Sequence, residues 1–394
     1  MLCLYSIFVI LNLTLKIQQK GYPMNKKEVL EIRRQFSPDN CAITRICGCY
    51  VDHEKEKKME FKKAFLSLPE EEAFKYFDIF RHTLSGTLGK NLINMEFPLE
   101  QEVPGGTQEF LLKLRDSRLE DDLLTEEFYD KVIENYNYAE NYFIILIHAV
   151  YDVPGKASDG LEMFDDTVYE HILCSICPVN LSKAGLSYNA QTNSIEDRIR
   201  DWLVDDPVKG FLFPAFQDRA SNIHQVLYYS KKPEELQPGF ITNVLGSAVP
   251  LTAKDQKTTF QSMISETLGE DCDYEVVRNI HENLNEMLEE AKETPEPLEL
   301  SRPDVRRLLE RSGAPEEKLA SFDREFEETV GEKNTLLASN IASVRSFQVE
   351  TPDVIVKVNP ERSDLVEIRE IDGRRCLVIA VDDHLEVNGI EVRE

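Results

Sequence analysis

The chain has 394 residues, 42% of them hydrophobic and 30% charged, which is the composition of a folded globular protein with room for more than one domain. Its formal net charge of −27 opposes nonspecific binding to phosphate backbones and anionic lipid surfaces. Nucleic acid is therefore disfavoured as a partner, except through a local basic patch such as the lysine-rich run from Lys55 to Lys63, which we expect to be a solvated helix face.

The N-terminal stretch is apolar, but its hydrophobic run is shorter than the ~20 residues of a membrane-spanning helix. It also lacks the basic n-region and small-residue cleavage site of a signal peptide. Met24 is followed by a polar helical pattern, so we expect residues 1–23 to be a non-native or disordered upstream extension. A membrane anchor or signal segment is the alternative. Translation from Met24 predicts no membrane association.

The eight cysteines are scattered along the chain, which fits reduced thiols in the cytoplasm better than a disulfide framework. Cys174 and Cys177 lie three apart in a predicted strand, so they point to opposite faces and cannot easily share one metal ion. Cys47 and Cys49 share one strand face, and a metal site there is the alternative. We expect buried structural cysteines, with no metal or cofactor.

The sequence predicts five successive regions. Residues 24–140 form a mainly helical region that includes one strand at 43–51. Residues 141–293 form an antiparallel sheet with covering helices, because apolar, branched and aromatic runs alternate with Gly, Pro, Asp and Asn. We place its strands near 141–153, 169–179, 211–216 and 224–230, a helix containing Trp202 at 196–204, and further helices at 255–268 and 274–292.

Residues 294–348 are predicted as a helical hairpin and connector, with Ser301 and Asp304 in a capping box. Residues 349–394 are predicted as a C-terminal β module, because Asp372–Gly373 and Asn388–Gly389 are typical two-residue hairpin turns. The expected fold class is α+β, with a central, mostly antiparallel sheet, packed helices and a small C-terminal β module.

Reactive side chains gather between the last two predicted strands of the sheet. Asp218, Arg219 and His224 lie within seven residues, so a hairpin could bring an acid, a cation and an imidazole together for acid–base chemistry or anion binding. Asp152 and Lys156, after the first strand, are a second candidate ligand-binding group. The structural alternative is that Asp218 builds the turn and pairs with Arg219, while Lys156 is solvated.

Two histidines, His148 and His171, fall within predicted strands and are expected to be core residues with satisfied hydrogen bonds. No motif identifies a catalytic residue or a reaction, so whether the protein is an enzyme stays open.

Several segments together resemble a bacterial family, domain of unknown function 4317. They are MNKKEVLEIRRQF at 24–36, ITRICGCYVD at 43–52, YDVPGK at 151–156, FLFPAFQDRASNIHQVLYYSK at 211–231 and VNPERSDLVEIREIDGR at 358–374. The resemblance covers nearly the whole chain from Met24. It implies no activity, cofactor or catalytic residue.

We therefore interpret the chain as a cytoplasmic binding or interaction protein, of which a regulatory role is one form, with another protein as the expected partner. The first alternative is a hydrolase- or transferase-type enzyme that uses Asp218, Arg219 and His224. The second alternative is a nucleic-acid-associated protein that uses the local basic patch. The sequence does not define the oligomeric state.

Overall fold

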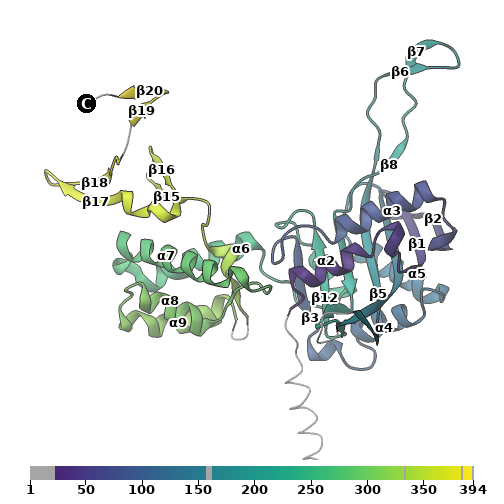
Figure 1. The fold of residues 1–394 in the computed structure, drawn as a ribbon, viewed down its shortest axis with the longest axis horizontal. Helices are drawn as coiled ribbons and strands as arrows, with labels where there is room; N and C mark the ends of the chain where they lie inside the picture. The colour runs from purple at the N-terminus through teal and green to yellow at the C-terminus, as the bar shows by residue number, and fades with distance from the viewer. Residues whose placement is uncertain (1–22, 157–161, 332–333, 383–384, 393–394) are drawn as a thin grey trace, which may run out of the picture. The chain divides into compact units, whose positions relative to one another are not determined.

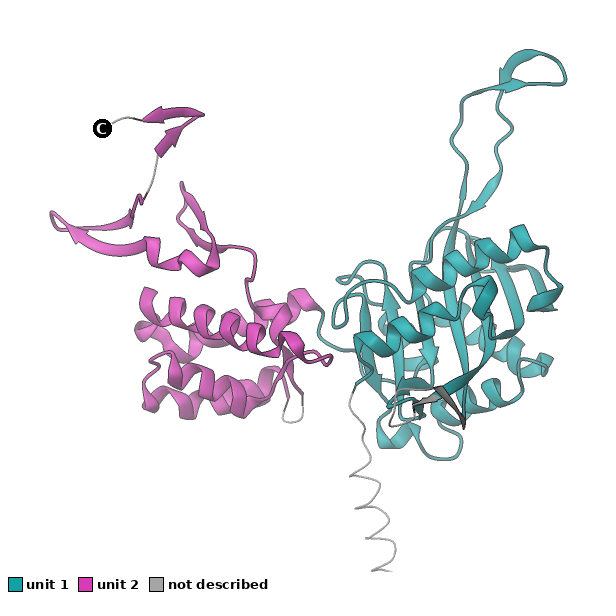
Figure 2. Ribbon diagram, in the orientation of Figure 1, with its two compact units in different colours: residues 1–252 teal, residues 253–394 magenta. Residues whose placement is uncertain are grey.

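The computed structural model describes residues 23–156, 162–331, 334–382 and 385–392, and it describes no side chains from 155 to 166. The expectation for the N-terminal extension therefore falls on residues that lie almost wholly outside this description. The chain divides into two compact units, the first ending at Thr252 and the second beginning at Ala253 (Figure 2).

A large sheet organises the first unit, and all its strand pairings are antiparallel (Figure 1). The strand order is β2-β1-β4-β5-β9-β12-β3, with β8 paired to the far end of β5. The predicted α+β class with a central antiparallel sheet is confirmed. The strands are β1 (Ile43–Val51), β2 (Lys57–Ala64), β3 (Leu92–Glu96), β4 (Tyr142–Lys156), β5 (Glu162–Leu181), β8 (Trp202–Val204), β9 (Lys209–Phe213) and β12 (Gln225–Ser230).

Helices cover both faces of the sheet. One face, here called the α2 face, carries α2 (Lys26–Arg34) and α3 (Glu70–Thr83); the other, the α5 face, carries α4 (Thr107–Asp116), α5 (Asp122–Asn135) and the π-helix η4 (Phe240–Val244). Strand β4 explains this arrangement. Its Ile144 and Leu146 enter the core on the α5 face, whereas Ile145 and Ile147 enter the core on the α2 face. The continuous apolar run therefore belongs to a strand buried on both sides, as its composition predicts.

The predicted hairpin near residue 218 is present, but its turn is tighter than expected. Strands β10 (Ala215–Gln217) and β11 (Ala220–Asn222) are joined by Asp218 and Arg219 alone. Both residues have positive φ, 47° and 62°, as a two-residue type I′ turn requires. Asn222 therefore lies in a strand instead of in the turn. Strands β9 and β12 pair directly, as predicted.

The helix predicted at 196–204 is wrong. The chain instead forms an arm, defined here as residues 182–204, which carries the hairpin of β6 (Leu186–Asn189) and β7 (Ser194–Asp197) and ends in β8 (Figure 1). Ile195, Ile199 and Trp202 are spaced as on a helix, but all three are exposed, so no core is present to favour that helix. Backbone pairing to the extended end of β5 determines the structure instead.

The second unit begins with a helical core. Its helices are α6 (Ala253–Leu268), α7 (Tyr274–Glu290), α8 (Arg302–Arg311), α9 (Glu316–Thr329) and α10 (Ala338–Ile341), with a short ladder between β13 (Glu299–Leu300) and β14 (Leu336–Leu337). The predicted capping box of Ser301 and Asp304 begins α8. The apolar stripe of α7 is used internally, because Ile280 and Leu284 are buried in this core.

The C-terminal β module consists of three two-stranded hairpins that do not join into one sheet. Asp372 and Asn388 have positive φ, as the two predicted turns require. The strands are β15 (Phe347–Glu350) with β16 (Ile355–Val358), β17 (Val366–Ile371) with β18 (Arg374–Ile379), and β19 (Leu385–Val387) with β20 (Ile390–Val392). The short 3-10 helices of the two units are Pro38–Asn40, Phe65–Ser67, Leu99–Gln101, Gly269–Asp271, Ala291–Glu293 and Pro360–Leu365. None of the described helices combines the length and the apolar character needed to cross a bilayer.

Candidate functional site

The turn at Asp218 and Arg219 is fastened to helix α2. The backbone N–H of Asp218 donates to Glu28 Oε1 at 2.8 Å, and Arg219 Nη1 donates to Glu31 Oε1 at 3.1 Å. Arg219 Nη2 also donates to the carbonyl of Pro154, at the end of β4. The turn and the 151–156 segment therefore meet. Their contact uses a backbone carbonyl, and it fixes Arg219 in place.

His224 lies with a different carboxylate. Its Nδ1 is 2.9 Å from Glu102 Oε1, and its backbone N–H donates to Asn222 Oδ1 at 3.0 Å. Asp218 contacts Glu28 through its backbone, as described above. The structure thus gives the predicted acid and imidazole separate partners, and it adds Glu102, which the sequence pattern did not indicate.

Asp152 faces away from the turn. Its neighbours Tyr151 and Val153 are buried in the core of the α2 face, where the turn also lies, so the exposed Asp152 points to the opposite face. The Lys156 side chain lies outside the described residues. Among the predicted site residues whose side chains are described, only Arg219 is thus joined to the other group, through Pro154.

Two of the surface cavities lie away from the turn, and neither contains a predicted site residue. The larger, about 250 Å³, lies at the N-terminus of α4, where Lys113 and Lys131 are already paired with Glu109 and Glu127. The smaller, about 200 Å³, lies between α7 and α8 in the second unit. The contacts of the predicted turn with α2 and β4 anchor it, and neither of these two cavities lies at it.

The cysteine pair on β1 is buried in the core of the α5 face. Burial raises the pKa of Cys47 to about 11 and of Cys49 to about 12, so both are neutral thiols at physiological pH. Cys174 lies in the same core and Cys177 in the core of the opposite face, as the strand geometry predicts.

Within the described residues, side chains gather with metal-ligand spacing only at Asp52, Glu54 and Glu56. Asp52, which is buried, accepts the N–H groups of the exposed Glu54 and Glu56 and pairs with Lys58 at 2.9 Å, so this acidic group stabilises a turn.

The lysine-rich run lies on β2 and its preceding turn, which corrects the predicted helix face. Lys57 is 2.9 Å from Asp130, and Lys62 is 2.5 Å from Asp122. Lys55 Nζ donates to the carbonyl of Ile133. Because these cations are paired within the protein, they offer little free positive charge to a nucleic acid.

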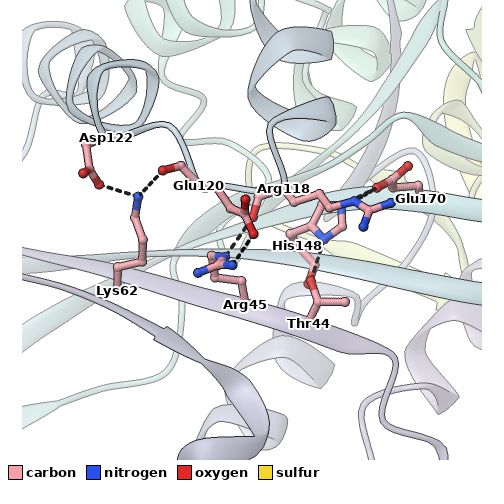
Figure 3. Close-up of polar contacts among 8 residues, drawn as sticks. All are labelled: Thr44, Arg45, Lys62, Arg118, Glu120, Asp122, His148 and Glu170. Carbon is pink, nitrogen blue, oxygen red and sulfur yellow. Dashed lines mark hydrogen bonds and ion pairs between the residues drawn. The ribbon is translucent and has the colours of Figure 1, made fainter.

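A second polar group, which the sequence pattern did not indicate, lies around His148 on β4 (Figure 3). His148 Nδ1 is 2.6 Å from Thr44 Oγ1, and His148 Nε2 is 2.9 Å from Glu170 Oε1. Arg118 Nε lies 3.3 Å from the same Glu170 oxygen. The expected satisfied core histidine is thus present at His148, where it joins the exposed residue Thr44 to an ion pair. The same expectation is wrong for His171, whose two buried ring nitrogens have no hydrogen-bond partner among the described residues.

The backbone places Thr44 in this arrangement. The register between β1 and β4 shifts there: Ile43 pairs with Ala149 and Arg45 with His148, which leaves Thr44 as the extra residue of a bulge. A bulge redirects the side chain of its extra residue, and bulges are common beside active sites.

The loop between α4 and α5 completes the group. Arg118 and Leu119 both have positive φ, 54° and 58°, an uncommon conformation for residues with a side chain. Arg45 holds this loop by donating to the carbonyl of Arg118 at 3.0 Å and to Glu120 at 2.6 Å (Figure 3). Lys62 also donates to the carbonyl of Glu120. Loop backbone in an uncommon conformation is therefore held beside the histidine group.

Burial determines the charge of the imidazole. It lowers the pKa of His148 because the fully buried ring loses water, and the nearby Glu170 opposes that shift. A neutral ring that donates from Nε2 to Glu170 presents Nδ1 as the acceptor for the Thr44 hydroxyl. The arrangement can therefore take a proton from Thr44.

The arm offers a different kind of surface. Across the β6–β7 hairpin, Leu186 pairs with Asp197 and Tyr188 with Ile195, so these side chains share one face. Leu186 is 76% exposed, Tyr188 61% and Ile195 63%. The opposite face is polar, and Glu196 accepts there from Asn189 at 3.1 Å. The hairpin is thus amphipathic, with a largely exposed face that is apolar except for Asp197.

The fold defines a helix-covered antiparallel α+β protein with a projecting arm, followed by a helical unit and β hairpins. A family model described as domain of unknown function (DUF4317) matches residues 24–390, and the chain belongs to this family. The expected family resemblance is thereby confirmed. A comparison with curated proteins gave no match.

Proposed function

We propose that this protein is an interaction protein whose arm docks with the arm of a second copy of the chain. The apolar face of the β6–β7 hairpin carries this proposal. An isolated two-stranded hairpin is marginally stable in water, so burial of Leu186, Tyr188 and Ile195 against a partner would stabilise it. Exposed contiguous apolar surface is also typical of protein interaction sites.

The charge of the arm supports a second copy as the partner. Residues 182–204 contain three basic and three acidic residues, so the arm is neutral, whereas the chain carries −27. Two copies repel each other through most of their surface, but two neutral arms do not. The extended arm also separates the acidic bodies by more than a Debye length of about 8 Å at physiological salt.

We place this interaction in the cytoplasm, as the seven described cysteines are all free thiols. The family resemblance supports a bacterial source. A regulatory role would follow if the association changes with protein concentration or salt.

Sedimentation velocity over a wide range of concentrations tests the proposal. We expect the wild type to dimerise, and the triple variant Leu186→Ser, Tyr188→Ser, Ile195→Ser to remain monomeric. A matched control replaces three exposed leucines elsewhere in the first unit, Leu66, Leu99 and Leu123, with serine and should dimerise as the wild type does.

Salt provides a second readout, because the Debye length grows to about 30 Å at 0.01 M, so repulsion between the acidic copies should weaken the dimer at low salt. A monomeric wild type at all concentrations, or a dimer that survives the arm substitutions, would overturn the proposal.

A further inference from the structure

A hydroxyl, an imidazole and a carboxylate from the adjacent strands β1, β4 and β5 are joined one after the other (Figure 3). Thr44 Oγ1 is 2.6 Å from His148 Nδ1, and His148 Nε2 is 2.9 Å from Glu170 Oε1. These distances are those of a nucleophile, its base and the acid that orients the base. We propose that Thr44 is the nucleophile of an acyl-transfer site that acts on small carboxylic esters or thioesters.

The exposure of Thr44, His148 and Glu170 fits their proposed roles as nucleophile, base and orienting acid. Thr44 is exposed, His148 is fully buried, and the Glu170 side chain is 30% exposed. A group built only to satisfy a buried histidine has no need of a partner on an exposed residue. Here the residue that would attack a substrate is the exposed one.

The hydrogen bonds determine the roles. Glu170 accepts the Nε2 proton of His148, which leaves Nδ1 as the acceptor for the Thr44 proton. The Thr44 hydroxyl has a second acceptor, the His148 carbonyl at 3.2 Å, but the ring nitrogen is nearer. Arg118, 3.3 Å from Glu170, is a positioning residue because it fixes the carboxylate that orients the ring.

The reaction balances with water as the second substrate. Thr44 Oγ1 attacks the acyl carbon while its proton moves to His148 Nδ1, and Glu170 stabilises the resulting imidazolium. The bond from the acyl carbon to the leaving oxygen or sulfur breaks, and the leaving group takes the proton from Nδ1. Water then attacks the acyl-threonine, gives a proton to Nδ1 and releases the carboxylic acid, as Thr44 recovers its proton.

Two backbone features, independent of the side-chain distances, support the proposal. The bulge at Thr44 directs this side chain toward His148. The positive φ angles of Arg118 and Leu119 occur in the loop that provides the partner of Glu170. Uncommon backbone conformations of this kind concentrate at functional sites.

The test combines turnover with covalent labelling of the full chain. p-Nitrophenyl acetate reports hydrolysis, and a fluorophosphonate probe followed by peptide mass spectrometry reports the attacking residue. We expect the adduct on Thr44 in the wild type. We expect Thr44→Val to lose about 10²-fold or more of the hydrolysis rate, and Thr44→Ser to retain hydrolysis and labelling because it keeps the hydroxyl.

The orienting residue has its own variant and readout. Glu170→Gln keeps a hydrogen-bond acceptor but not the charge that stabilises the imidazolium, so we expect a lower rate at saturating substrate with a smaller change in KM. A purely structural role would instead alter the melting temperature and leave the rate of the folded protein unchanged.

Adduct mapping on the wild type locates the nucleophile even if Thr44→Val fails to fold. No hydrolysis and no adduct in the wild type, an adduct on another residue, or a folded Thr44→Val variant that hydrolyses as fast as the wild type would each overturn the proposal.

Discussion

Replacement of His171 by leucine should remove part of the acid sensitivity of the first unit. The His171 ring is fully buried and lies against Tyr169, with ring centroids 4.4 Å apart. Burial lowers the pKa of His171 to about 3, and the nearby His148 adds to the shift. The folded chain therefore keeps this ring neutral over the range in which an unfolded chain would protonate it.

The sign and size of the effect follow from this difference. Below the ordinary pKa of 6.5 the unfolded chain binds a proton at His171, whereas the folded chain binds it only near pH 3, so the free energy of unfolding falls as the pH falls. From pH 7 to pH 5 this linkage removes about 2 kcal/mol from the wild type. Leucine cannot bind the proton, so His171→Leu should not lose this amount.

Urea unfolding at pH 7 and pH 5 measures the effect, with hydrogen exchange of β4 and β5 peptides reporting the first unit separately from the second. Carboxylates and His148 titrate in both proteins, so the difference between the two pH dependences isolates His171. Equal losses in the wild type and in His171→Leu would show that the ring is not held neutral, and the reasoning from burial would be refuted.

Two further substitutions test the packing around the sheet. Gly210→Ala should destabilise the first unit by about 1–3 kcal/mol, because a Cβ there would collide with the carbonyl of Cys174 and with Thr83, whereas Gly185→Ala, in open space, should leave the melting temperature unchanged. Asn25→Ala should cost about 1 kcal/mol, because Asn25 Oδ1 accepts from the backbone N–H groups of Lys27 at 2.9 Å and Glu28 at 3.1 Å. Since Glu28 also accepts from Asp218, hydrogen exchange at the Asp218 N–H should become faster in Asn25→Ala, and unchanged exchange there would contradict the coupling.

The interior of the sheet could be predicted because its sequence pattern is strong. The apolar run of β4 is buried on both faces, and the opposite burial of Cys174 and Cys177 follows from strand alternation. The outer strands could not be predicted in this way. β2 is rich in lysine because its side chains pair with acidic residues of α5, such as Asp130, and only the fold brings these residues together.

In the arm, by contrast, the spacing of apolar residues predicts a helix that the structure does not contain. The helical spacing of Ile195, Ile199 and Trp202 predicts a helix only if a core lies against that stripe. Here β5 extends beyond the ends of its neighbouring strands, and β8 pairs with this extension instead of forming a helix. The apolar side chains stay exposed, and one of them, Ile195, belongs to the hairpin face on which the proposed interaction rests.

The Thr44 group depends on features that a sequence pattern does not contain. Thr44 lies 104 residues from His148, and a bulge in the β1–β4 ladder directs the Thr44 side chain toward the ring. Glu170 could have been placed near His148 from the β4–β5 register, but only once that register was known. The reactive residues of the Asp218 turn are close together in sequence, which predicts a site, but a tight turn also requires polar residues close together in sequence. Chemistry in this fold is better sought where distant residues meet at irregular backbone, and the Thr44 bulge meets that condition.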